Sequence, residues 1–153
     1  FSLNFNTSVA WKNFDVSLYF NSVVGNDIYN NLANVIDNLS MFSKGSNTTV
    51  HATQTNEAFN NVLDYSNRYI EDGSYLRLSS ATLGYTVPLK NKRYISNLRF
   101  TLTGNNLFVI TGYSGYDPEV NSNRTSNGVP ALGIGWTNYP MARSYSLGVS
   151  IDF

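Results

Sequence analysis

Strict alternation between apolar and polar side chains over the last twelve residues constrains the fold of this chain more than any other feature. One set of alternate positions is largely apolar and ends on an aromatic residue: Arg143, Tyr145, Leu147, Val149, Ile151 and Phe153. The other set is small or polar: Ser144, Ser146, Gly148, Ser150 and Asp152. Because successive side chains of a β-strand point to opposite faces, this segment predicts a strand with one apolar and one polar face. Such a strand suits a soluble sheet with one dry side or a membrane barrel with lipid outside and water inside, and the terminal aromatic favours the barrel.

Composition narrows the class of protein. The formal net charge is zero and only 13% of the residues are charged, so we expect no nucleic-acid partner. Aromatic residues make up 14% of the chain, with eleven Tyr, a residue that membrane interfaces favour because its ring is apolar and its hydroxyl needs water. The absence of cysteine argues against a small domain built on disulfides. No apolar run approaches the roughly 20 residues of a membrane-spanning helix, so any insertion would use strands.

The amino-terminal part of the chain predicts a β-hairpin. Residues 1–11 and residues 14–21 each alternate between apolar and polar side chains. Between them lie Lys12 and Asn13, a short turn in which Asn tolerates the positive φ of a tight hairpin. Since residue 1 already lies inside a strand pattern, we expect the chain to be a piece of a longer protein.

Two further strands lie in the middle of the chain, so that the whole chain is predicted to hold about five strands. The third covers about residues 74–87, and a change of parity near Ser79 and Ser80 predicts a β-bulge. The fourth covers residues 98–103, after which residues 104–106 break the pattern.

Two long polar segments, at about residues 25–72 and 111–141, separate these strands and predict loops. In the first, Asp27 is predicted to cap a short helix. The apolar face of that helix would hold Ile28, Leu32, Val35, Ile36 and Leu39. Outer-membrane barrels keep short turns in the periplasm and long loops outside, so the short turns near residues 12–13 and 90–94 predict extracellular loops and a periplasmic carboxyl terminus.

The second long segment holds the candidate site residues. Asp117 and Glu119 flank Pro118 and offer oxygen ligands to a hard cation, but two carboxylates fall short of the 6–8 ligands that calcium takes, and a structural turn is the alternative. Aromatic side chains in the same segment are candidates for stacking on sugar rings or for packing within the loop or against a partner: Tyr113, Tyr116, Trp136 and Tyr139.

Other residues point to no chemistry. His51, the only histidine, lies in a polar loop, so we expect no catalytic site, no cofactor and no metal centre. Arg77 and Arg99 lie on predicted strands, where we expect an ion-pair role inside a watery lumen.

Four segments carry a family resemblance. They are VVGNDIYN at residues 23–30, GSYLRLSSATLGYTVP at residues 73–88, LRFTLTGNNLFVITGYSGYDPEVN at residues 98–121 and YPMARSYSLGVSIDF at residues 139–153. In this order the last three resemble the carboxyl end of SusC/RagA-type TonB-dependent outer-membrane transporters, and the first resembles an earlier element of the same family.

The resemblance implies an all-β fold, a transmembrane antiparallel β-barrel of roughly 22 strands of which residues 1–153 supply the carboxyl-terminal portion. Family members import glycans or peptides across the bacterial outer membrane, draw energy through TonB and pair with a SusD-type surface lipoprotein that acts as a lid. The plug and the TonB-contacting segment would lie in an amino-terminal part that is missing from this chain, so transport is the expected function of the parent protein. The terminal aromatic strand resembles the signal read by the outer-membrane assembly machinery, which implies that its apolar residues are both wall and assembly signal: Tyr145, Leu147, Val149, Ile151 and Phe153.

Three alternatives stay open. The chain could be a complete small barrel, although its two long loops leave too few residues for eight strands. It could belong to a non-transporting structural or adhesin barrel, which would share the apolar face. It could also be a soluble sandwich module, in which the terminal Phe would belong to the core.

Overall fold

The computed structural model describes residues 1–36, 65–90, 94–120, 125–126, 129–130, 133–136 and 138–153. The chain divides into two compact units. The strand unit comprises Phe1–Val24, Tyr75–Thr111 and Met141–Phe153, and the loop unit comprises Gly25–Ser74 and Gly112–Pro140. Within the residues described, no helix has the length and apolar character needed to span a membrane.

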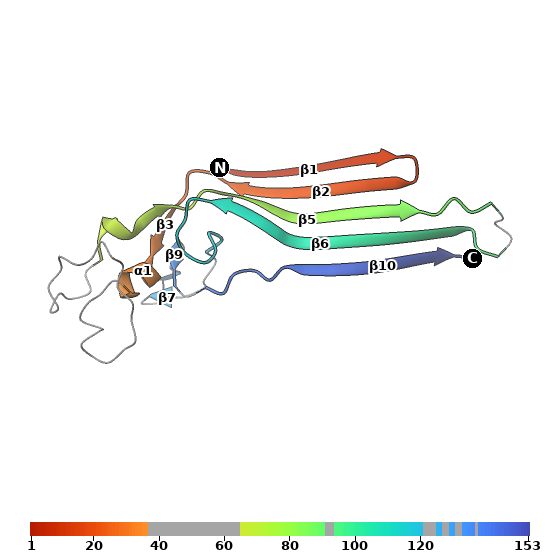
Figure 1. Cartoon of the computed structure of the whole chain (residues 1–153). Helices are drawn as coiled ribbons and strands as arrows, with labels where there is room; N and C mark the ends of the chain where they lie inside the picture. The colour runs from red at the N-terminus through yellow and green to blue at the C-terminus, as the bar shows by residue number, and fades with distance from the viewer. Residues whose placement is uncertain (37–64, 91–93, 121–124, 127–128, 131–132, 137) are drawn as a thin grey trace. The chain divides into compact units, whose positions relative to one another are not determined.

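The strand unit is one antiparallel sheet of five strands (Figure 1). Its strands are β1 (Ser2–Trp11), β2 (Phe14–Val23), β5 (Tyr75–Thr86), β6 (Asn97–Thr111) and β10 (Ser144–Asp152). They lie side by side in the order β1-β2-β5-β6-β10. The prediction of five antiparallel strands is therefore confirmed, while the described residues form an open sheet with β1 and β10 at its edges.

The predicted hairpin is confirmed, but its turn differs in detail. Trp11 pairs with Phe14 across a turn of two residues. The sequence predicts the positive φ at Asn13, but it is Lys12 that has a positive φ, of 55°. Asn13 takes part in the sheet, because its carbonyl accepts a hydrogen bond of 2.8 Å from the backbone N–H of Thr86.

The predicted bulge lies at Ser79. On β2, Tyr19 pairs with Ser80 and Phe20 pairs with Leu78, so Ser79 is skipped. The partner strand is irregular at the same level, where Ser80 pairs with Asn105 and Leu78 with Phe108. The break in the pattern at residues 104–106 is thus a local irregularity around Asn106, which has a φ of 52°, and β6 continues through it to Thr111.

Cross-strand pairing collects the apolar side chains on one face of the sheet. Directly paired residues point to the same face, so the pairs define rows that run across all five strands. Two of the apolar rows are Val9–Val16–Leu83–Leu102–Leu147 and Trp11–Phe14–Tyr85–Phe100–Val149. The row between these two is small or polar and faces the other side: Ala10–Asp15–Gly84–Thr101–Gly148. The alternation in the sequence is therefore a property of the whole sheet.

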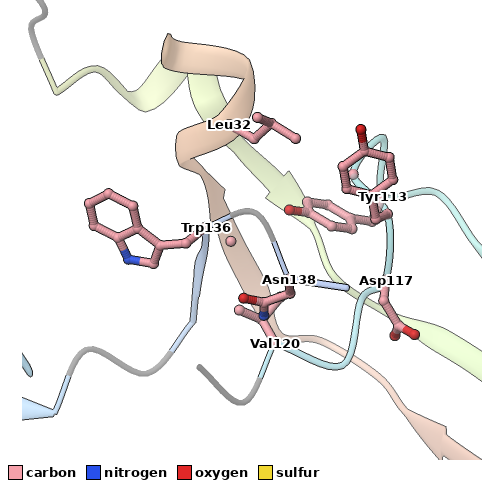
Figure 2. Close-up of a pocket in the computed structure, with 9 residues that line it drawn as sticks. Leu32, Tyr113, Asp117, Val120, Trp136 and Asn138 are labelled. Atoms are coloured by element: carbon pink, nitrogen blue, oxygen red, sulfur yellow. The ribbon is translucent and has the colours of Figure 1, made fainter. Parts of the chain in front are cut away.

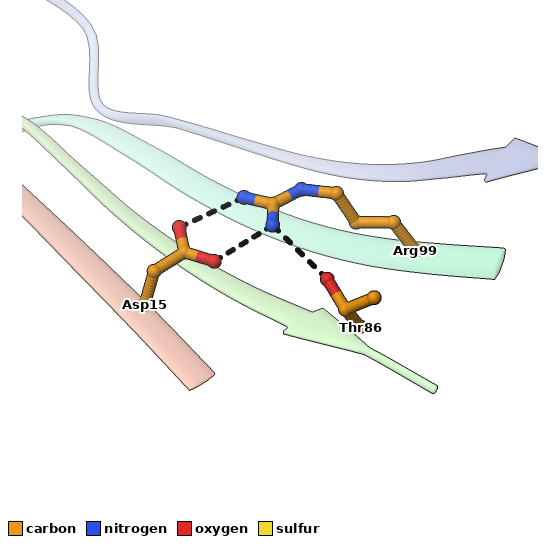
Figure 3. A network of polar contacts seen from close by, with 3 residues as sticks. All are labelled: Asp15, Thr86 and Arg99. Atoms are coloured by element: carbon orange, nitrogen blue, oxygen red, sulfur yellow. Dashed lines mark hydrogen bonds and ion pairs between the residues drawn. The ribbon is translucent and has the colours of Figure 1, made fainter. Parts of the chain in front are cut away.

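An ion pair on the polar face joins three strands (Figure 3). Arg99 on β6 donates two hydrogen bonds to the Asp15 carboxylate on β2, at 2.7 Å and 2.8 Å, and a third of 3.3 Å to the Thr86 hydroxyl. The pair passes over Gly84 on the intervening strand, where a Cβ atom would meet the Arg99 guanidinium and both Asp15 carboxylate oxygens. The expected ion-pair role of Arg99 is confirmed. Arg77 has only 4% of its surface exposed, and its guanidinium lies 5.8 Å from the centre of the Tyr75 ring.

The two segments that had been predicted as loops form the loop unit, which contains regular structure of its own. The elements are β3 (Asp27–Asn30), α1 (Asn31–Ile36), the 3-10 helix η2 (Asn67–Tyr69), β4 (Ile70–Asp72), β7 (Thr125–Ser126), β8 (Val129–Pro130) and β9 (Ile134–Gly135). Strand β3 lies between β4 and β9 in a small sheet, pairing antiparallel with β4 and parallel with β9.

The predicted helix exists, but it begins three residues later than expected, at Asn31 and not at Ile28. Asp27 lies in β3 and does not cap the helix, so the predicted cap is wrong. The Asn30 side-chain oxygen accepts a hydrogen bond of 3.0 Å from the Ala33 backbone N–H and caps α1 instead. Ile28 is also in the strand, where only 1% of its surface is exposed. Leu39 lies outside the described residues.

We predict that Gly84→Ala destabilises the sheet by less than the roughly 1–3 kcal/mol of an overpacked core, because the atoms that its Cβ meets are the ends of two flexible, partly exposed side chains. The new Cβ would displace the Asp15–Arg99 ion pair. The free energy of unfolding of the intact parent protein in detergent, from urea titration, checks this. Gly112→Ala is the control, because a Cβ there meets nothing within 4 Å, and an equal effect of both substitutions would contradict the prediction.

Candidate functional site

Four of the six candidate site residues lie around one small hollow in the loop unit: Tyr113, Tyr116, Asp117 and Trp136. Leu32 from α1 and Val120 complete much of its lining (Figure 2). The hollow has a volume of about 10 Å³, at the lower limit for a single water molecule. Glu119 and Tyr139 are not among the residues that line it. The sequence segment therefore folds on itself here and leaves no room for a sugar ring inside the hollow.

Asp117 is part of a turn. Its side chain is only 6% exposed, and one carboxylate oxygen accepts a hydrogen bond of 2.9 Å from the backbone N–H of Glu119. The carbonyl of Pro118 accepts a bond of 3.0 Å from the N–H of Val120 in the same turn. This arrangement supports the structural reading of Asp117 over the cation-binding reading. Among the residues that the structure describes, no three His, Cys, Asp or Glu side chains gather in a way that could hold a metal ion.

Tyr113 packs inside the loop unit, with 8% of its surface exposed. Two glycines make room for it, because a Cβ at Gly115 would strike the ring and a Cβ at Gly135 would strike the phenolic oxygen. Burial, with the nearby negative charge of Glu71 as a second cause, raises the pKa of the Tyr113 phenol above its usual value. Tyr113 is therefore a packing residue in this fold.

The other aromatic candidates differ in exposure. Tyr116 and Tyr139 have 67% and 91% of their surfaces exposed, whereas Trp136 is half-buried. Stacking on a ligand therefore stays a prediction that fits Tyr116 and Tyr139 better than Tyr113.

Glu71 holds the two segments of the loop unit together, a role that no pattern in the sequence indicates. One carboxylate oxygen accepts hydrogen bonds from the Asn30 side-chain amide at 2.9 Å and from the Ser114 hydroxyl at 2.7 Å. The other oxygen accepts a bond of 2.7 Å from the Ser114 backbone N–H. Asn30 also donates to the Ser114 hydroxyl at 3.0 Å, which closes the network. These partners lie 41 and 43 positions from Glu71, a separation that no local pattern reveals.

A second aromatic group lies elsewhere in the loop unit. The Tyr29 ring is 5.9 Å from that of Tyr65 and 6.4 Å from that of Tyr69, measured between ring centres. The Tyr29 hydroxyl accepts a hydrogen bond of 2.8 Å from the Asn34 side-chain amide. Desolvation by burial raises the pKa of Tyr29. The group stabilises the junction of β3, α1 and η2.

Four of the five residues expected to form an assembly signal share one face of the sheet. Tyr145, Leu147, Val149 and Ile151 alternate along β10 and are all exposed, with Leu147 at 75%. Phe153 follows the strand and is 91% exposed. The structure thus places them together, while their role in assembly stays a prediction.

The relatives of this chain are TonB-dependent receptors, although no family model matches it. It is 30% identical over 169 residues to TonB-dependent receptor P3 of Formosa agariphila and 31% identical over 155 residues to TonB-dependent receptor SusC of Bacteroides thetaiotaomicron. These alignments include 100% and 96% of this chain but only 16% and 14% of the relatives. The relatives are receptors and not enzymes, in agreement with the expectation that this chain is not an enzyme.

Solved structures show the same fold. The RagAB peptide importer in its open-open state matches with a TM-score of 0.73 at 21% identity, over 99% of this chain and 17% of the importer chain. A second structure of the RagAB peptide transporter matches with a TM-score of 0.68. Together with the sequence relatives, these matches show that the chain is homologous over its full length to the SusC/RagA-type TonB-dependent receptors, of which it spans about 16%.

Proposed function

We propose that this chain is part of a TonB-dependent transporter that imports glycans or peptides across the bacterial outer membrane. The observation that carries the proposal is the division of the five-stranded sheet into one apolar and one polar face, in a chain homologous to such receptors. The apolar face is exposed along whole strands, for example at Val9 (65%), Leu102 (49%) and Leu147 (75%). Contact with acyl chains gives these side chains an apolar environment, and the opposite face with its Asp15–Arg99 pair then borders a watery lumen.

The loop unit is proposed to lie outside the cell and to meet a SusD-type surface lipoprotein and the ligand. Its support is the exposure of Tyr116 and Tyr139 and the internal order that Glu71 provides. The related RagAB structures are of a peptide importer, which supports a peptide as cargo, and glycans are the other class of cargo that the family resemblance implies. Coupling to TonB is assigned to parts of the parent protein outside this chain.

Uptake by the intact parent protein tests the proposal. Cells that express it with its lipoprotein partner should accumulate labelled peptides or glycans, and the accumulation should disappear when TonB is removed. Surface binding without any TonB-dependent uptake would instead support a non-transporting barrel.

We predict that Leu147→Arg destabilises the parent protein by about 2–4 kcal/mol if residue 147 lies near the bilayer midplane, because a charge would replace a lipid-facing side chain. Ser146→Arg is the matched control. Ser146 precedes Leu147 on β10 and points to the polar face, so it should tolerate the charge far better. Urea titration of the folded protein in lipid vesicles measures both. Equal destabilisation would show that the two faces are wrongly assigned.

Glu71→Ala is expected to weaken capture of the lipoprotein partner while leaving the amount of inserted barrel unchanged. Loss of the carboxylate leaves Asn30 and Ser114 without their shared acceptor, at a cost of roughly 1–3 kcal/mol that falls on the loop unit. Asp27→Ala is the control, because it removes an exposed carboxylate from the same unit. Co-purification of the partner at matched surface expression decides the question, and unchanged capture would rule out a role for this network.

A further inference from the structure

The apolar face of the sheet contains a groove. It runs across β5 and β6 and has a volume of about 220 Å³. Its floor is made by two small residues, Ala81 and Gly104, and its sides include Leu83, Leu102, Leu107 and Tyr145. All of these belong to the strand unit.

The groove exists because the residues in the middle of one row of the sheet have small side chains or none. This row is Thr7–Leu18–Ala81–Gly104–Tyr145. The next apolar row carries a large side chain at every position, including Leu83 and Leu102. Leu107, displaced by the irregularity in β6, leans over Gly104, where a Cβ would lie 2.8 Å from the Leu107 Cδ2 atom. Small residues on the floor and a leucine from the irregular segment thus leave a channel in an otherwise filled wall.

The distance of the groove from the hairpin turn indicates which part of a lipid molecule would meet it. Leu18 follows Phe14, the first residue after the hairpin turn, by four positions, and at about 3.3 Å per residue the row lies roughly 13 Å from the turn. Because the strands of such barrels tilt by roughly 35–45°, this distance corresponds to about 10 Å along the membrane normal, less than half the height of an apolar band about 25 Å tall. A headgroup would lie well away from this level, whereas the acyl chain of a lipid reaches it.

We propose that this groove binds one acyl chain of a membrane phospholipid. The inference rests on the proposed placement of the apolar face against lipid. The groove is continuous with that face and is lined almost entirely by hydrocarbon. Thr82 lies between the apolar positions Ala81 and Leu83, and its hydroxyl is 3.1 Å from the Thr103 hydroxyl. The volume of the groove is below the range of roughly 300–1,000 Å³ typical of sites for compact ligands, which fits a single narrow chain.

Photo-crosslinking of the intact parent protein tests the proposal. The protein is reconstituted in vesicles of phosphatidylethanolamine and phosphatidylglycerol that contain a trace of phosphatidylethanolamine with a diazirine within one acyl chain. After illumination, labelled peptides are mapped by mass spectrometry. We expect labelling of Leu102 and Leu107 to exceed that of Val9 on the same face by several-fold. Ala81→Leu should fill the floor and lower the labelling of Leu102 and Leu107 several-fold, with Val9 unchanged.

Two variants make the result specific. Thr7→Leu adds bulk in the same row but outside the groove, so it should leave the labelling of Leu102 unchanged. Leu107→Ala widens the groove and should raise the labelling of Leu102, which gives a second readout if Ala81→Leu does not fold.

The outcomes separate this proposal from the one on which it rests. Uniform labelling of the apolar face that Ala81→Leu does not alter would overturn the groove and leave the membrane placement standing. Absence of label from the whole apolar face would overturn both. In a second arrangement a diazirine-bearing amino acid replaces Leu102, and its crosslinking to another protein chain in place of lipid would also overturn the proposal.

Discussion

The bulge at Ser79 is the constraint on which the strand unit depends. Side chains of a strand alternate with a period of two, so a run that changes parity would send half of its apolar residues to the wrong face. In β5 the apolar residues change from even positions, such as Leu76 and Leu78, to odd positions, such as Ala81 and Leu83. Skipping Ser79 in the pairing with β2 absorbs this change, and the apolar face stays continuous along the strand. The irregularity of β6 at the same level is the matching adjustment on the other side.

On the polar face, glycines leave space for side chains from neighbouring strands. Gly84 lets Arg99 reach Asp15 across a whole strand. Gly148 lies under the Thr101 hydroxyl in a similar way, in the same row of the sheet. Side chains on this face can therefore lie along the sheet and bond to one another. Such lateral bonding keeps charged groups paired on the wall of a proposed lumen and fixes the register of three strands at once.

The loop unit shows that long polar connections need not lack structure. Its order comes from a few polar side chains with several partners each, above all Glu71 with Asn30 and Ser114, and from buried residues such as Ile28 and Tyr113. A surface held in this way presents its exposed aromatics in a defined arrangement, which lowers the entropy lost when a partner or ligand binds. This is the property that a receptor requires of segments that are proposed to meet both a lipoprotein and a cargo.

The sequence by itself determined the five long strands, apart from the second half of β6, together with the hairpin, the bulge and the two-faced character of the sheet. These features are local, because a period of two and a change of parity can be counted along the chain. The family was also accessible, since motifs such as residues 73–88 and 98–121 carry it. The position of the helix cap could not be predicted from the sequence, because both Asp27 and Asn30 are suitable capping residues. The choice between them depended on Ile28 entering a strand.

Tertiary structure alone decided how the candidate site is built. Tyr113, Tyr116 and Tyr139 are equivalent as sequence letters, yet Tyr113 is buried and the other two are exposed, because Gly115 and Gly135 leave space for the Tyr113 ring. The partners of Glu71, the path of Arg99 over Gly84 and the groove above Ala81 and Gly104 likewise join residues from different strands or loops. The physical reason is that such contacts depend on which strands become neighbours and in which register. A pattern along one strand describes only the faces of that strand and not what lies opposite.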